Sequence, residues 1–64
     1  MRLKRNDILE IFKDFSKSQG FYGRLLNNLN DLKENDPNTY EKYMKNLEDH
    51  EFKDVVDLVL YIES

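Results

Sequence analysis

A chain of 64 residues predicts one domain with a thin hydrophobic core, because so short a polymer cannot support a second core. It contains no cysteine, which excludes disulfides and thiolate metal sites and fits a reducing cytosol. Charged residues make up 36% and hydrophobic residues 39% of the chain, so we expect a folded, soluble protein with no signal peptide and no membrane span.

The first predicted helix covers residues 6–17. We expect it to begin at Asn6 or Asp7, because either side chain can accept hydrogen bonds from free backbone amides. The segment 16–20 after it predicts a break, since serines compete for backbone hydrogen bonds and Gly20 permits a left-handed turn. One face of this helix is apolar and carries Ile8, Leu9, Ile11, Phe12 and Phe15.

The second predicted helix covers residues 19–33, and Ser18 is positioned to cap its start. Gly23 lies at the edge of the apolar arc, where the missing side chain lets another backbone approach closely. One interpretation of this segment is therefore a tight helix crossing at Gly23. The apolar arc spans about 140° and consists of Phe21, Tyr22, Leu25, Leu26, Leu29 and Leu32.

The third predicted helix covers residues 37–49, and its start has the strongest helix-start signal in the chain. Asp36 suits the position before a helix, and Pro37 suits the first helical turn. The apolar stripe is narrower here and consists of Tyr40, Tyr43, Met44 and Leu47.

The fourth predicted helix covers residues 51–62 and is apolar over an arc of about 200°. Its β-branched run also fits a strand, but Asp54 and Asp57 interrupt the run at helical spacing. One contact face needs less than this arc, so the helix either lies at the centre of the bundle or meets a second chain. The second alternative predicts a homodimer through this helix, with Leu58 as a candidate protein-binding residue.

Apolar residues recur at spacings of three and four in all four segments, and Gly20, Gly23 and Pro37 are the only glycines and prolines. The sequence therefore predicts an all-α fold, a small bundle of three to four short helices in a single domain that spans residues 1–64.

No residue pattern predicts catalysis or a bound cofactor. His50 is the only histidine, which excludes a site built on a histidine pair, and a surface histidine at a helix end is its ordinary interpretation. The acidic run 48–51 lacks the glycine and the alternating oxygen ligands of a calcium loop. We expect a protein that is not an enzyme, with no catalytic residue, metal ligand or cofactor.

Charge is distributed unevenly along the chain, whose net charge is -3. Residues 1–33 carry seven Lys or Arg against four Asp or Glu, whereas residues 34–64 carry three against nine. The break before the second helix suggests a helix-turn-helix, but Asp31 and Glu34 neutralise the basic residues of that helix, which disfavours nucleic acid as a partner. DNA binding by the basic N-terminus, or DNA mimicry by the acidic half, is the alternative function.

The segment 18–26, SQGFYGRLL, is the least generic part of the chain, because two glycines and two aromatics at a helix start are costly unless they are used. One interpretation places Phe21 and Tyr22 in the core. The other makes Gln19, Tyr22 and Arg24 a protein-contact patch, since Tyr and Arg are enriched at binding hot spots.

The same SQGFYGRLL segment, followed about 25 residues later by FKDVVDLV at residues 52–59, resembles a group of very short proteins carried by phages and plasmids of Firmicutes. The similarity covers most of the chain. The resemblance implies an accessory protein of a mobile element, located in the cytoplasm of a bacterial host, that binds a host or phage protein. It implies no activity and no site.

Overall fold

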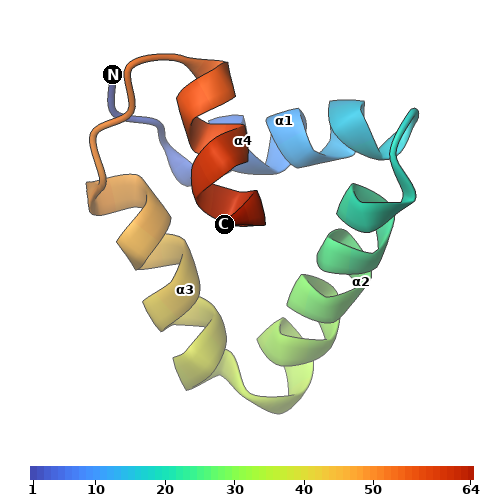
Figure 1. The fold of residues 1–64 in the computed structure, drawn as a ribbon. Coiled ribbons are helices and arrows are strands. Elements are labelled where there is room, and N and C mark those ends of the chain that lie inside the picture. Colours follow the sequence, from blue (N-terminus) through green and yellow to red (C-terminus); the bar gives the residue numbers. More distant parts are fainter.

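The computed structural model describes residues 1–64 and contains four α-helices and no strand, which confirms the predicted all-α fold. The helices α1, α2 and α3 run along the three sides of a triangle, and the shorter α4 lies over the space between them (Figure 1). Their bounds are α1 Arg5–Ser16, α2 Gly20–Asn35, α3 Pro37–Asp49 and α4 Val55–Glu63.

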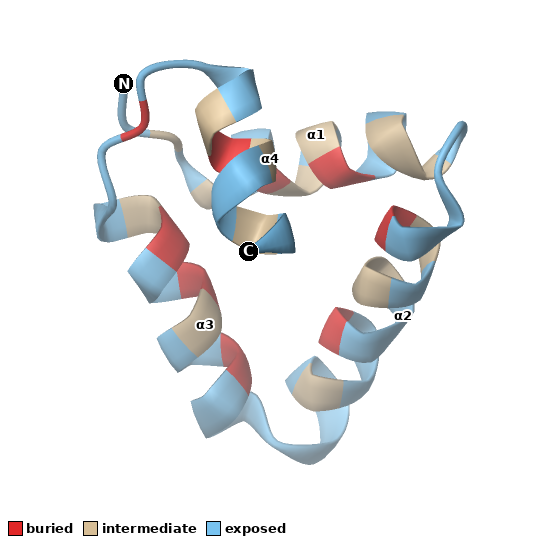
Figure 2. Cartoon of the chain, viewed as in Figure 1, coloured by how far each residue is buried: buried red, intermediate tan, exposed pale blue.

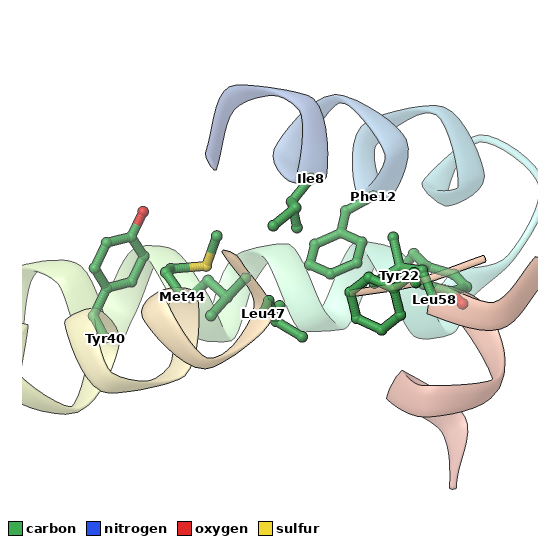
Figure 3. Close-up of a cluster of buried hydrophobic side chains, with 9 residues drawn as sticks. Ile8, Phe12, Tyr22, Tyr40, Met44, Leu47 and Leu58 are labelled. Carbon is green, nitrogen blue, oxygen red and sulfur yellow. The ribbon is translucent and has the colours of Figure 1, made fainter. Parts of the chain in front are cut away.

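All four helices contribute to one hydrophobic core, and the buried positions lie on their inward sides (Figure 2). Phe12 of α1, Tyr22 of α2 and Leu58 of α4 converge at one end of this core (Figure 3). α4 joins it through side chains, because its backbone does not approach the other helices closely. The buried residues are Ile8, Phe12, Tyr22, Leu29, Tyr40, Met44, Leu47, Phe52 and Leu58.

The predicted cap of α1 is wrong, because the helix begins at Arg5 and neither Asn6 nor Asp7 precedes it. Lys4 occupies the N-cap position and makes no side-chain cap hydrogen bond. The sequence signal failed here because a distant helix holds the start of α1: the Arg5 guanidinium donates to carboxylates of α3. Asp7 still stabilises the first turn through the helix dipole.

The turn between α1 and α2 also differs from the prediction. Ser18 does not cap α2, because its hydroxyl donates to the Phe15 carbonyl at 3.4 Å. Gly20 is the first residue of α2 and has no positive φ, so the predicted left-handed turn is absent. The backbone amides of Ser18 and Gln19 close the turn by donating to the same Phe15 carbonyl at 3.1 and 2.9 Å.

The α2–α3 junction forms as the sequence predicts. Asp36 ends α2 and caps α3: its carboxylate accepts the Thr39 amide at 3.3 Å and the Thr39 hydroxyl at 2.7 Å. Pro37 occupies the first turn, where its missing amide costs nothing. These hydrogen bonds lower the pKa of the Asp36 carboxyl, the bond from the Thr39 hydroxyl most of all.

α4 begins at Val55 rather than at residue 51, because the chain before it pairs with the N-terminus. The Phe52 amide donates to the Met1 carbonyl at 2.8 Å, and the Met1 ammonium group donates to the Phe52 carbonyl at 2.6 Å. His50 and Asp54 on either side of Phe52 have extended backbones, so the segment that carries this pairing is not helical. Of the two alternatives for its wide apolar arc, contact from several sides within the bundle is not what the fold shows, since one side of α4 faces outward (Figure 2).

Candidate protein-interaction surface

The structure divides the four candidate binding residues into two pairs. Gln19 and Arg24 are exposed near the start of α2. Tyr22 and Leu58 are 0% exposed and belong to the core, so neither can contact a partner in this fold. The patch predicted around Tyr22 is therefore corrected to the two polar residues beside it.

Aromatic packing explains the burial of Tyr22. Its ring lies 5.9 Å from that of Phe12, 5.3 Å from Phe15 and 5.2 Å from Phe21, centroid to centroid, with the last two arranged edge to face. Such pairs stabilise the core beyond the area that they bury. Of the two aromatics in SQGFYGRLL, Tyr22 faces inward and Phe21 stays 40% exposed.

Gly23 does not mark a close helix crossing. A Cβ built at this position meets nothing within 4 Å, so the space beside Gly23 is open. The prediction of a tight crossing there is wrong. A single glycine at the edge of an apolar arc is compatible with both open and crowded surroundings, so sequence spacing could not distinguish them.

A reciprocal cap fixes the start of α4. The Asp54 carboxylate accepts the Asp57 amide at 3.0 Å, and the Asp57 carboxylate accepts the Lys53 amide at 3.0 Å. This is a variant of the capping box, because the second carboxylate accepts the amide of Lys53, the residue before the N-cap, rather than the N-cap amide itself. The cap explains why so short a helix, nine residues long, begins at a defined residue.

The inner side of α4 is attached to the core and to α3. Leu58 is fully buried and Ile62 packs against the core. The Tyr61 hydroxyl donates to the Asn46 side-chain oxygen at 2.6 Å, and the Tyr61 ring lies 4.6 Å from that of His50. These contacts fix which side of α4 faces solvent.

The opposite side of α4 presents apolar side chains to solvent. Val56 and Leu60 are each 63% exposed, more than any other large hydrophobic residue of the chain. At about 100° per residue, their midpoint lies about 160° around the helix from the buried pair Leu58 and Ile62. Val59 is half-buried beside them. We call Val56, Val59 and Leu60 the outer face of α4.

The sequence predicts the wide apolar arc of this helix and Leu58 as its contact residue, but the fold buries Leu58. The arc alone does not say which part turns inward, because that depends on where α4 docks. Val56 and Leu60, which the periodicity treated as equal to Leu58, are the residues that the fold leaves uncovered.

The surface of α4 is acidic. Asp57 and Glu63 lie beside the outer face, Asp54 lies at its N-terminal end, and none of the three is in an ion pair. Lys53 is the only Lys or Arg after residue 45. The outer face is therefore an apolar strip accompanied by carboxylates that have no partner in an ion pair.

Arg5 is paired within the molecule. Its guanidinium makes two hydrogen bonds to the Glu41 carboxylate, at 2.8 and 2.9 Å, and one to Glu48 at 2.9 Å. It also lies 5.7 Å from the centroid of the Tyr40 ring, within range of a cation–π contact. The hydrogen bonds to Glu41 and then to Glu48 raise the pKa of Arg5, and the bond from Arg5 lowers the pKa of Glu41.

The remaining surface offers one hollow, on α1, lined by Asn6, Leu9, Glu10 and Lys13. No three His, Cys, Asp or Glu side chains meet as metal ligands. None of the four helices has both the length and the apolar composition that crossing a membrane requires.

The chain matches no protein-family model, no curated protein and no solved structure significantly.

Proposed function

We propose that this chain is a non-catalytic protein-binding module and that the outer face of α4 is its binding surface. The observation that carries the proposal is the 63% exposure of both Val56 and Leu60 on a helix whose other side is held in place. Isolated exposed hydrophobic residues are ordinary, but adjacent ones on an ordered element are typical of interaction sites.

Burial of the outer face against a partner stabilises the complex. Complete burial of a Val or Leu side chain stabilises a complex by roughly 1.5 to 3 kcal/mol relative to full exposure. Val56 and Leu60 retain about two thirds of that gain for a partner, which amounts to roughly 2 to 4 kcal/mol together. The reciprocal cap and the Tyr61 hydrogen bond order α4 before binding, so less entropy is lost when a partner docks.

The proposal includes the biological setting that the resemblance implies. In that setting the chain is an accessory protein of a phage or plasmid, and the partner is a protein of the host cell or of the element itself.

A nucleic-acid-related role is the weaker candidate. Of the basic N-terminal residues, Arg5 is engaged by Glu41 and Glu48, which leaves Arg2 and Lys4 to contact phosphates. DNA mimicry draws support from the unpaired carboxylates near α4, but the apolar strip between them has no counterpart in a phosphate backbone.

The test is affinity capture from bacterial lysate with the native chain, with Val56→Thr/Leu60→Gln, and with Arg24→Ala. Circular dichroism first establishes that all three are folded. We expect the native chain and Arg24→Ala to retain the same protein, and the α4 variant to lose about tenfold or more of it, which corresponds to about 1.4 kcal/mol. Equal capture by the α4 variant and the native chain contradicts the proposal.

A further inference from the structure

The acidic residues around the outer face of α4 indicate the chemistry of what covers it. We infer that its occupant is a basic amphipathic helix of another protein, with an apolar strip that packs on Val56, Val59 and Leu60 and with Lys or Arg beside that strip, opposite Asp57 and Glu63. This inference rests on the proposed function and specifies its partner.

The acidic side chains near the outer face lie where the basic side chains of such a helix would meet them. At about 100° per residue, Asp57 lies about 80° to one side of the midpoint of Val56 and Leu60. Glu63 falls between Val59 and Val56 in angle and lies one turn beyond Val59 and Leu60, at the C-terminal end of the strip. An amphipathic helix laid along this strip brings its own polar residues close to both carboxylates. One acidic side and one acidic end therefore select a partner whose apolar strip is bordered by basic residues.

Neither carboxylate has a cation within the molecule. The chain has four ion pairs, and their acidic members are Glu51, Glu41, Glu48 and Asp14. The Asp57 carboxylate accepts only the Lys53 amide, and the Glu63 carboxylate takes part in neither an ion pair nor a side-chain hydrogen bond. Both remain able to pair with a partner's Lys or Arg, which contributes to specificity and association rate more than to affinity.

Charge argues against a second copy of this chain as the occupant. If two outer faces met, each would bring Asp57 and Glu63 toward those of the other, and α4 itself contains no Lys or Arg. Like charges that are brought together across an interface oppose binding.

The area of the outer face sets the strength of the contact with any occupant. Nine residues at about 1.5 Å each make α4 about 13 Å long, and a helix is about 10 Å wide. The outer face and a helix laid on it together bury roughly 500 Å² even if the accessible area is twice the footprint, which is below the roughly 1,200 Å² of specific stable interfaces and is typical of a transient contact. The acidic residues around the outer face repel nucleic acid and anionic membranes.

The test uses three synthetic peptides of about 18 residues, or five helical turns. They share one leucine strip and differ only in their flanking residues, which are Lys, Gln or Glu. Binding to the isotopically labelled full chain is followed by the shifts of its backbone amide signals. We expect the Lys peptide to shift the amides of residues 55–61, the Gln peptide to bind about fivefold more weakly, and the Glu peptide to show no binding.

Two matched double variants distinguish the effect of the charges near the outer face from the effect of the protein's net charge. Asp57→Asn/Glu63→Gln keeps an oxygen acceptor at the α4 cap but removes the flanking charges, whereas Asp31→Asn/Glu34→Gln removes two exposed charges of α2. The first double variant is expected to bind the Lys peptide about fivefold more weakly than the native chain does, and the second less than about twofold more weakly. Equal weakening by both pairs, or equal binding of the Lys and Glu peptides, overturns the inference.

Two further outcomes separate this inference from the proposed function. A dimer detected by sedimentation that dissociates in Leu60→Gln identifies a second copy as the occupant and overturns the basic partner. If no peptide binds while lysate capture still depends on Leu60, the inferred basic partner is wrong and the proposed function stands. If lysate capture is also independent of Leu60, the inferred partner and the proposed function are both wrong.

Discussion

The Tyr22 hydroxyl is the only buried side-chain polar atom of the chain that lacks a hydrogen-bond partner. Burial raises the pKa of this phenol, and the nearby negative charge of Glu63 raises it further. The hydroxyl is therefore protonated at neutral pH. Folding removes its hydrogen bonds to water, and no protein group replaces them. An unsatisfied buried donor costs roughly 1 to 3 kcal/mol.

Replacing Tyr22 with Phe is expected to stabilise the fold by about 1 kcal/mol, because it keeps the ring and removes the unsatisfied hydroxyl. Urea unfolding measures the change. Tyr61→Phe is the matched control and is expected to have the opposite sign, since it removes the hydrogen bond to Asn46. A loss of stability in Tyr22→Phe contradicts the prediction and shows that the hydroxyl has a partner. Tyr22→Ala is unsuitable as a binding probe, because it empties part of the core.

Among the helices, α2 has an interior glycine without a packing reason. Gly23 has a helical environment and open space where a Cβ would be. Glycine in a helix interior costs roughly 0.5 to 1 kcal/mol relative to alanine, because its unfolded backbone is more flexible.

We expect Gly23→Ala to stabilise the chain by about 0.5 to 1 kcal/mol, measured by thermal or urea unfolding. Gly20→Ala is the control at the first residue of α2, where the added Cβ comes 3.8 Å from the Arg24 guanidinium and the gain is expected to be smaller. If Gly23→Ala destabilises the chain, another group lies against Gly23, as the sequence had suggested.

The starts of α3 and α4 show which structural features can be predicted from the sequence. The start of α3 was predictable because Asp36, Pro37 and Thr39 act within one turn. The start of α4 was not, because the Phe52 backbone is hydrogen-bonded to Met1, which is 51 residues away. The exposed side of α4 was unreadable for a related reason: Leu58 and Leu60 belong to the same apolar arc, and only the docking of the helix separates the buried residue from the exposed one.

At the scale of the whole molecule, Arg5 ties the start of α1 to α3. Its hydrogen bonds reach Glu41 and Glu48, which lie two helical turns apart on α3. These side chains are partly exposed to water, so each ion pair is weak, and their value lies in fixing two helices that have few direct contacts.

Acid is expected to weaken the fold through Glu41. The hydrogen bond from Arg5 lowers the pKa of Glu41 below its ordinary 4.5 in the folded state. Its contribution is therefore fully present above pH 4.5 and is lost as the pH falls through the lower, folded-state pKa. Asp36 adds to the same trend, because its pKa is also lowered.

Unfolding midpoints measured between about pH 6 and about pH 3 test this expectation. Glu41→Gln is expected to reduce the decline in stability toward low pH, whereas Glu34→Gln, which removes an exposed carboxylate outside the ion pairs, is expected to leave the decline unchanged. The same acid slope in Glu41→Gln and the native chain contradicts the role given to the Arg5 contact.

The pairing of Met1 with Phe52 has a kinetic consequence. α1 with α2, and α2 with α3, are neighbours along the chain and can collide early, since short loops close at little entropic cost. Joining residue 1 to residue 52 closes a far longer loop, so the seating of Leu58 and the ordering of α4 are expected to come last as the chain assembles. By the same reasoning α4 is the first segment to open, and an occupant on its outer face would slow that opening.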